Sequence, residues 1–126
     1  MKPGIQSVGI AGSPNFRKWE PDDPDVVVTS AFINIGPRTR GKGALDQVKK
    51  SDTFTIMVAT PAGLGTLESK DGILLSNRKL VVMRRYDVDD LWRWLERIVA
   101  SCEAATWEDC VDKLRAHFDW EFETMK

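Results

Sequence analysis

The side chains of this chain that could do chemistry are few and far apart. The single histidine, His117, stands beside Phe118 near the end of a helix-type pattern, where a cation complements the helix dipole. The chain has no G-x-S-x-G, H-E-x-x-H or Walker A pattern, and its paired carboxylates fall in loops and at helix starts, where caps and water account for them. We therefore expect no catalytic residue and no enzyme.

The two cysteines, Cys102 and Cys110, also fit a structural role better than a chemical one. They form no C-x-x-C pair, and the chain offers only His117 as an imidazole ligand. Two small buried residues that stay reduced are a better interpretation than a metal site or a disulfide. We expect no metal and no cofactor.

Charge is unevenly distributed along the chain. Residues 1–85 carry thirteen Lys and Arg against eight Asp and Glu, whereas residues 86–126 carry five against eleven. The segment 38–50 is basic but lacks the aromatic residues that nucleic-acid binders interleave with their cations. Because the segment is basic, a small nucleic-acid-associated or regulatory binding module stays open as the alternative function, although the missing aromatic residues make it the weaker one. It would use Arg38, Arg40, Lys42, Lys49 and Lys50.

Two tryptophans indicate a protein-binding surface. Trp19 lies in a loop rich in Pro and Asp, and Trp94 falls at the margin of an apolar helix stripe, although half-buried packing explains each of them equally well. Acidic residues beside both would attract a basic partner. The predicted binding residues are Trp19, Glu20, Asp22, Asp23, Asp25, Asp89, Asp90 and Trp94.

The elements that position these residues are predicted strands in the first two thirds of the chain and two predicted helices in the last third. Apolar and β-branched runs predict strands over residues 6–10, 26–35, 53–60, 73–75 and 79–85, and their short links favour antiparallel pairing. Asp87 and Thr106 are good N-caps for two amphipathic helices. We predict a single α+β domain over residues 1–126, with an antiparallel sheet of about four or five strands and two C-terminal helices on one face.

No apolar stretch of the chain is long enough to cross a membrane, and the first fifteen residues lack the apolar run of a secretory signal. We therefore expect a cytoplasmic protein that does not bind membranes.

Three sequence segments in the C-terminal third resemble those of a known family. The segments RYDVDDL (85–91), SCEAATWEDCVDKL (101–114) and DWEFE (119–123) are similar, in order and spacing, to the bacterial immunity protein 8 family. The IGP at 35–37 matches as well, whereas Ala104 and Ala105 stand where the family often has Gly-Asp.

This resemblance implies a protein that is not an enzyme and that neutralises one cognate toxin by binding it. Such toxins belong to polymorphic systems, including contact-dependent growth inhibition, and are often nucleases. The expected partner is therefore a toxin C-terminal domain that cleaves RNA such as tRNA, with its active site blocked and no nucleic acid bound directly. Contact surfaces must differ between cognate pairs, so we expect the shared motif residues to form the scaffold rather than the site.

Overall fold

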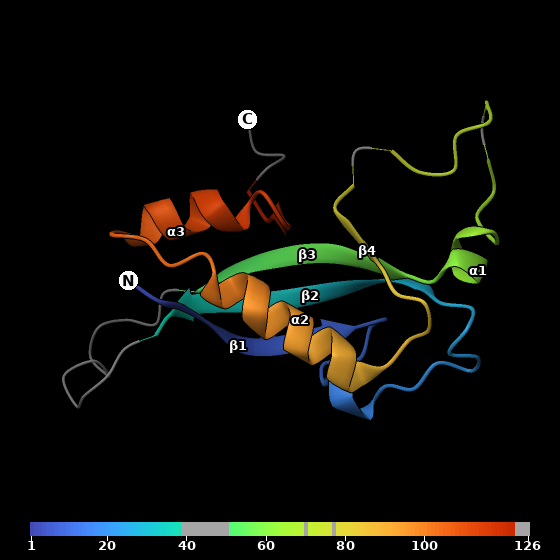
Figure 1. Ribbon diagram of the computed structural model, residues 1–126, viewed down its shortest axis with the longest axis horizontal. Helices are drawn as coiled ribbons and strands as arrows, with labels where there is room; N and C mark the ends of the chain where they lie inside the picture. The colour runs from blue at the N-terminus through green and yellow to red at the C-terminus, as the bar shows by residue number, and fades with distance from the viewer. Residues whose placement is uncertain (39–50, 70, 77, 123–126) are drawn as a thin grey trace.

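The computed structural model describes residues 1–38, 51–69, 71–76 and 78–122. Five strands form one sheet, and α2 lies across one face of it (Figure 1). The strands are β1 (Pro3–Ile10), β2 (Val28–Pro37), β3 (Asp52–Ala59), β4 (Leu80–Val82) and β5 (Asp119–Trp120). The helices are the 3-10 turn η1 (Phe16–Lys18), the short α1 (Pro61–Leu64), α2 (Val88–Ala100) and α3 (Trp107–Leu114).

The predicted α+β class is confirmed, with one exception in the strand pairing. β1 pairs with β2, β2 with β3, and β5 with β3, all antiparallel, whereas β4 runs parallel to β3 with Met57 opposite Leu80. The antiparallel prediction is wrong for β4 because the chain passes through α1 and a long connection before it returns to β3. Residues 73–75 form no strand, and the predicted strand over 79–85 is only three residues long.

The core lies between this sheet and the two longer helices. Side chains alternate along β2 and β3, so that every second residue is buried under the helices, including Ile33 and Ile56. α2 contributes Leu91, Leu95 and Val99 to the core. The opposite face of the sheet carries smaller and more polar side chains around Phe32, which is 48% exposed.

Both helices begin where the sequence predicts. The carboxylate of Asp87 accepts hydrogen bonds from the backbone N–H groups of Asp89 and Asp90, and the hydroxyl of Thr106 accepts one from Asp109. The indole Nε1 of Trp107 donates to a carboxylate oxygen of Asp52 at 2.9 Å, which ties α3 to the start of β3.

Cys102 and Cys110 are buried and form no disulfide, as predicted. Burial raises the pKa of the Cys102 thiol above its ordinary value, which keeps the thiol protonated.

Candidate functional site

The loop over residues 19–25 lies beside the start of α2, so the two predicted acidic groups lie near each other. Three contacts join them. The guanidinium of Arg17 pairs with the carboxylate of Asp89 at 3.1 Å, and the Arg85 side chain lies 3.7 Å from the Asp25 carboxylate. The backbone N–H of Tyr86 donates to the carbonyl of residue 24 at 2.8 Å. We call the predicted binding residues together the acidic face: Trp19, Glu20, Asp22, Asp23, Asp25, Asp89, Asp90 and Trp94.

Thr60 holds the far end of this loop in place. It is 1% exposed, and its hydroxyl donates to the carbonyl of Asp25 at 2.7 Å. The same oxygen accepts from the backbone N–H groups of Val27 at 2.9 Å and Gly63 at 3.1 Å. The Pro that follows Thr60 marks it as a helix N-cap, but its bonds to the distant loop have no local signal in the sequence.

Both tryptophans combine packing with access to solvent. The Trp19 ring meets the Tyr86 ring edge-on, with centroids 5.1 Å apart, and Trp94 meets Phe118 in the same way at 6.2 Å. Each ring also lines a surface groove. Trp94 lines one of about 580 Å³ between α2 and the segment 81–87, and Trp19 lines one of about 430 Å³ beside Asp22 and Asp23. They are therefore half-buried and still able to contact a partner.

Part of the negative charge of this face is neutralised within the molecule. Asp89 pairs with Arg17, Asp25 with Arg85, and Asp90 with Arg93. In contrast, three acids of the loop form no ion pair with any residue that the structure describes. These are Glu20, Asp22 and Asp23.

Tyr86 lies near both predicted tryptophans, since its ring meets that of Trp19 and it lines the same groove as Trp94. It is 7% exposed, and its hydroxyl group has no hydrogen-bond partner among the described residues. Burial, and secondarily the nearby Asp87 carboxylate, raises the pKa of the Tyr86 hydroxyl above its ordinary value.

No other chemistry gathers on the described part of the chain. Within it, no three His, Cys, Asp or Glu side chains come close enough together to hold a metal ion. Its helices are also too short or too polar to cross a membrane. Of the basic residues behind the alternative function, Arg38 is described and exposed, whereas the other four lie outside the described residues: Arg40, Lys42, Lys49 and Lys50.

The family model for immunity protein 8 matches residues 4–125, nearly the whole chain. The chain belongs to the immunity protein 8 family. This membership implies an immunity protein that acts against a polymorphic toxin, with the cognate toxin as its partner, and it suggests an inhibitor that is not an enzyme. No curated protein and no solved structure matches the chain significantly.

The motif residues of the immunity protein 8 resemblance mostly serve the scaffold, as predicted. Tyr86, Cys102 and Trp107 are buried, Asp87 caps α2, and Trp120 packs against the core. Two residues depart from this prediction, since the side chain of Phe122 is 41% exposed and Glu103 lies on the surface at the turn after α2.

Proposed function

We propose that this immunity protein neutralises a nuclease, the C-terminal domain of a toxin used in contact-dependent growth inhibition. The nuclease acts on RNA such as tRNA, and the acidic face covers its active site. The inhibition takes place in the cytoplasm and involves no direct binding of nucleic acid by the immunity protein.

The observation that carries this proposal is the group of unpaired acids in the loop. A nuclease must attract phosphate groups, so its active cleft is basic. The carboxylates of Glu20 and Asp22 form no ion pair with any described residue of the immunity protein. They can therefore attract a basic cleft over a distance and accelerate association of the two proteins. Trp19, which is half-buried and lines a groove together with Asp22, supplies apolar contact area of the kind that typically dominates interface energies, and Trp94 supplies more in a second groove.

The double variant Glu20→Lys/Asp22→Lys tests the proposal most cleanly. Both side chains are exposed and make no described hydrogen bond, whereas Asp23 accepts one from the backbone of Asp25 and Asp25 pairs with Arg85. Association of the variant with the cognate toxin domain should be slower by about tenfold or more at low salt, and its rate should depend less on salt. Stopped-flow mixing at several salt concentrations measures both effects.

A matched control carries the same change of charge at the other end of α2, as Glu103→Lys/Glu108→Lys. Both residues are exposed and lie at the turn and helix start beyond α2. This control should keep the wild-type association rate to within about twofold. Equal slowing in both double variants would show that only net charge matters and would remove the acidic face from the interface.

Occlusion of the active site has its own test. If the acidic face covers the catalytic cleft, tRNA and the immunity protein must compete for the toxin, and the complex must neither bind nor cleave tRNA. A ternary complex of toxin, immunity protein and tRNA would place the contact away from the cleft.

A further inference from the structure

The face of the sheet that points away from α2 carries four neighbouring rows of uncharged residues. The strand register places three residues in each row, one from each of three adjacent strands. The rows are Ser7, Asn34 and Thr53; Gly9, Phe32 and Thr55; Ser30, Met57 and Leu80; and Val28, Ala59 and Val82. We call these twelve residues the open face. All of them except Ala59 are exposed or partly exposed.

The lack of charge on the open face is unusual for this chain. Charged residues make up 29% of the sequence, so about three or four would be expected among twelve positions, and soluble surfaces typically hold at least that share. Asp119 lies next to Thr55 at the sheet edge, and its carboxylate accepts a hydrogen bond from the backbone N–H of Lys79 at 3.3 Å. The open face itself has none of the charges that keep an exposed sheet apart from other proteins.

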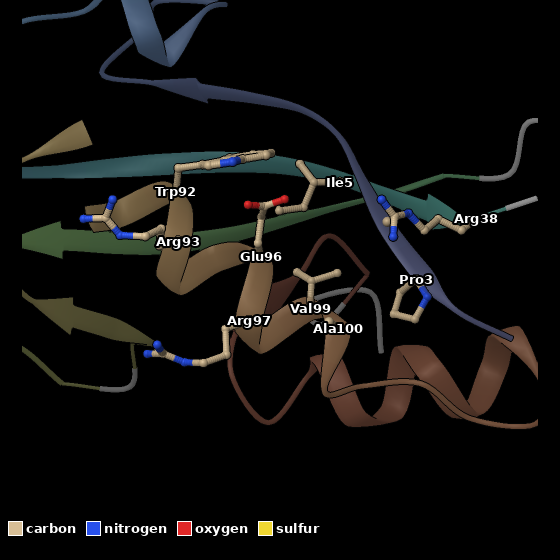
Figure 2. Close-up of a pocket in the computed structure, with 10 residues that line it drawn as sticks. Pro3, Ile5, Arg38, Trp92, Arg93, Glu96, Arg97, Val99 and Ala100 are labelled. Carbon is tan, nitrogen blue, oxygen red and sulfur yellow. The ribbon is translucent and has the colours of Figure 1, made fainter. Parts of the chain in front are cut away.

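The helix side of the sheet differs in this respect. A groove of about 540 Å³ lies between β1 and α2, and Figure 2 shows the Glu96 carboxylate pointing into it and Arg38 opposite, on the strand side. Arg93 and Arg97 also belong to its lining. This groove therefore mixes charges of both signs, as a solvated surface does.

The edges of the sheet are protected against pairing with another strand. β1 has a bulge between Ile5 and Ser7, and at its end the backbones of Ile10 and Ser13 bond to each other at 2.9 and 2.8 Å. The opposite edge consists of β4, with three residues, and β5, with two. Bulges and short strands are common devices against edge-to-edge association. Association through the sheet is therefore favoured at its open face and not at its edges.

The open face holds both a projecting ring and a hollow. Phe32 is 48% exposed and lies between the small residues Gly9 and Thr55. Beside it is a groove of about 350 Å³, which Gly9 and the turn at 12–14 also line. A Cβ atom on Gly9 would lie 3.0 Å from the carbonyl oxygen of Ser13, so this turn folds closely over the strand and forms one wall of the groove. One chain therefore offers both halves of a reciprocal contact.

The same lack of charge favours a second copy of the chain as the occupant. In a two-fold symmetric dimer the same patch lies on both sides, and residues near the axis meet their own copies. A charge at the axis would face a like charge, so such an interface needs uncharged residues there. A basic nuclease, in contrast, would find no carboxylate among the twelve residues of the open face.

The size of the open face suits a weak dimer. With strands about 4.8 Å apart and a rise of about 3.4 Å per residue, its four rows of three cover roughly 400 Å². Two copies then bury roughly 800 Å² from these residues alone and more with the rim around them, which is the range of reversible rather than obligate contacts. The Asn34 side chain bonds to the hydroxyls of Ser7 and Thr53, both at 2.7 Å, so these polar groups are already paired when the face is covered.

We propose that two copies of this chain form a reversible dimer through their open faces. Phe32 lies near the two-fold axis, and each Phe32 ring enters the groove beside the Phe32 of the other copy. Val28, at one corner of the open face, also lines the groove beside Asp22, whereas Phe32 lies two rows away. The dimer does not depend on whether the acidic face binds a nuclease.

Sedimentation equilibrium of the full chain tests this proposal. The weight-average mass should rise with concentration from the monomer value of 14.2 kDa toward twice that value, with a Kd of roughly 10–100 μM. Phe32→Lys places like charges together near the axis and should weaken the dimer by about tenfold or more. Because Phe32 is exposed, the variant should keep the far-ultraviolet circular dichroism spectrum of the wild type.

Ile73→Lys is the matched control, because Ile73 is an apolar residue outside the open face and is 58% exposed. This control and Glu20→Lys/Asp22→Lys should each leave the Kd of the dimer within about twofold of the wild type. A mixture of Phe32→Lys and Phe32→Glu should associate more strongly than either variant alone, because opposite charges then meet near the axis.

Four results would overturn the proposal. The wild type could stay monomeric up to about 1 mM, the Phe32→Lys and Ile73→Lys variants could weaken the dimer equally, or the mixed variants could gain nothing over the single ones. Phe32→Lys could also lose binding of the cognate toxin domain while the wild type is monomeric, which would assign the open face to the toxin.

Discussion

The buried hydroxyl group of Tyr86 gives the sharpest stability prediction. It has no hydrogen-bond partner among the described residues, while the ring that carries it packs edge-on against Trp19. Tyr86→Phe removes the hydroxyl and keeps the ring. A buried donor without a partner costs about 1–3 kcal/mol, so its removal should raise the free energy of unfolding by about 1 kcal/mol.

The predicted change is large enough to measure in urea. With a denaturant slope of roughly 2 kcal/mol per molar, a gain of about 1 kcal/mol moves the unfolding midpoint up by about 0.5 M. Tyr86→Ala is the matched control, because it removes the ring as well and should cost about 3–5 kcal/mol. The pair separates the contribution of the hydroxyl from that of the ring.

The pH dependence follows from the raised pKa of the same hydroxyl. The folded state keeps the phenolic proton to a higher pH than the unfolded chain, whose tyrosine titrates near the ordinary value of about 10. The contribution of this group to wild-type stability is therefore independent of pH below about 10, and stability falls as the pH rises from there through the folded-state pKa. The Y86F variant lacks this loss, so its advantage should widen in that window.

The chain makes the assay direct, because Tyr86 is its single tyrosine. The ultraviolet absorbance of tyrosinate then reports one group, which should titrate above pH about 10 in the folded protein and near 10 in urea. A folded-state midpoint at or below 10, or a loss of about 1 kcal/mol or more in the Y86F variant, would show that the hydroxyl is solvated or bonded and would refute the reasoning.

Three further substitutions probe the contacts that position the site, each measured by urea unfolding. Thr60→Val should cost about 2–4 kcal/mol because three backbone groups lose their hydroxyl partner, and Thr60→Ser should cost far less; similar losses in both would contradict this role. Trp107→Phe should cost about 1.5–3 kcal/mol through the lost bond to the Asp52 carboxylate, and a double-mutant cycle with Asp52→Ala that gives no coupling would disprove that bond. Asp87→Ala should cost about 1 kcal/mol as a lost N-cap, which Asp87→Asn should largely restore.

Both C-terminal helices could be predicted from the sequence because their signals are local. A capping side chain bonds to backbone groups two or three residues away, and an apolar stripe repeats within each turn. Asp87 and Thr106 accordingly cap α2 and α3. Trp94, at the margin of its stripe, is half-buried as its position on the helix indicates.

The neighbours of the candidate site could not be predicted because they depend on contacts between distant segments. Arg17 and Asp89 are 72 residues apart in the chain and form an ion pair. The direction of β4 likewise depends on the path of the connection after α1, which has no periodic signal. The sequence therefore suggested two acidic groups but could not show that they lie near each other, or that arginines neutralise half of them.

The residues that anchor the acidic loop differ from the charged residues that it exposes. The acidic loop is anchored by Thr60 and by the backbone of Tyr86, groups that a partner does not need to touch. Glu20 and Asp22 make no described hydrogen bond or ion pair, so changing them should alter stability by less than about 0.5 kcal/mol. Surface charge can therefore change the rate and choice of partner while the anchors keep the loop in place, and a slower association in Glu20→Lys/Asp22→Lys can be attributed to the interface rather than to unfolding.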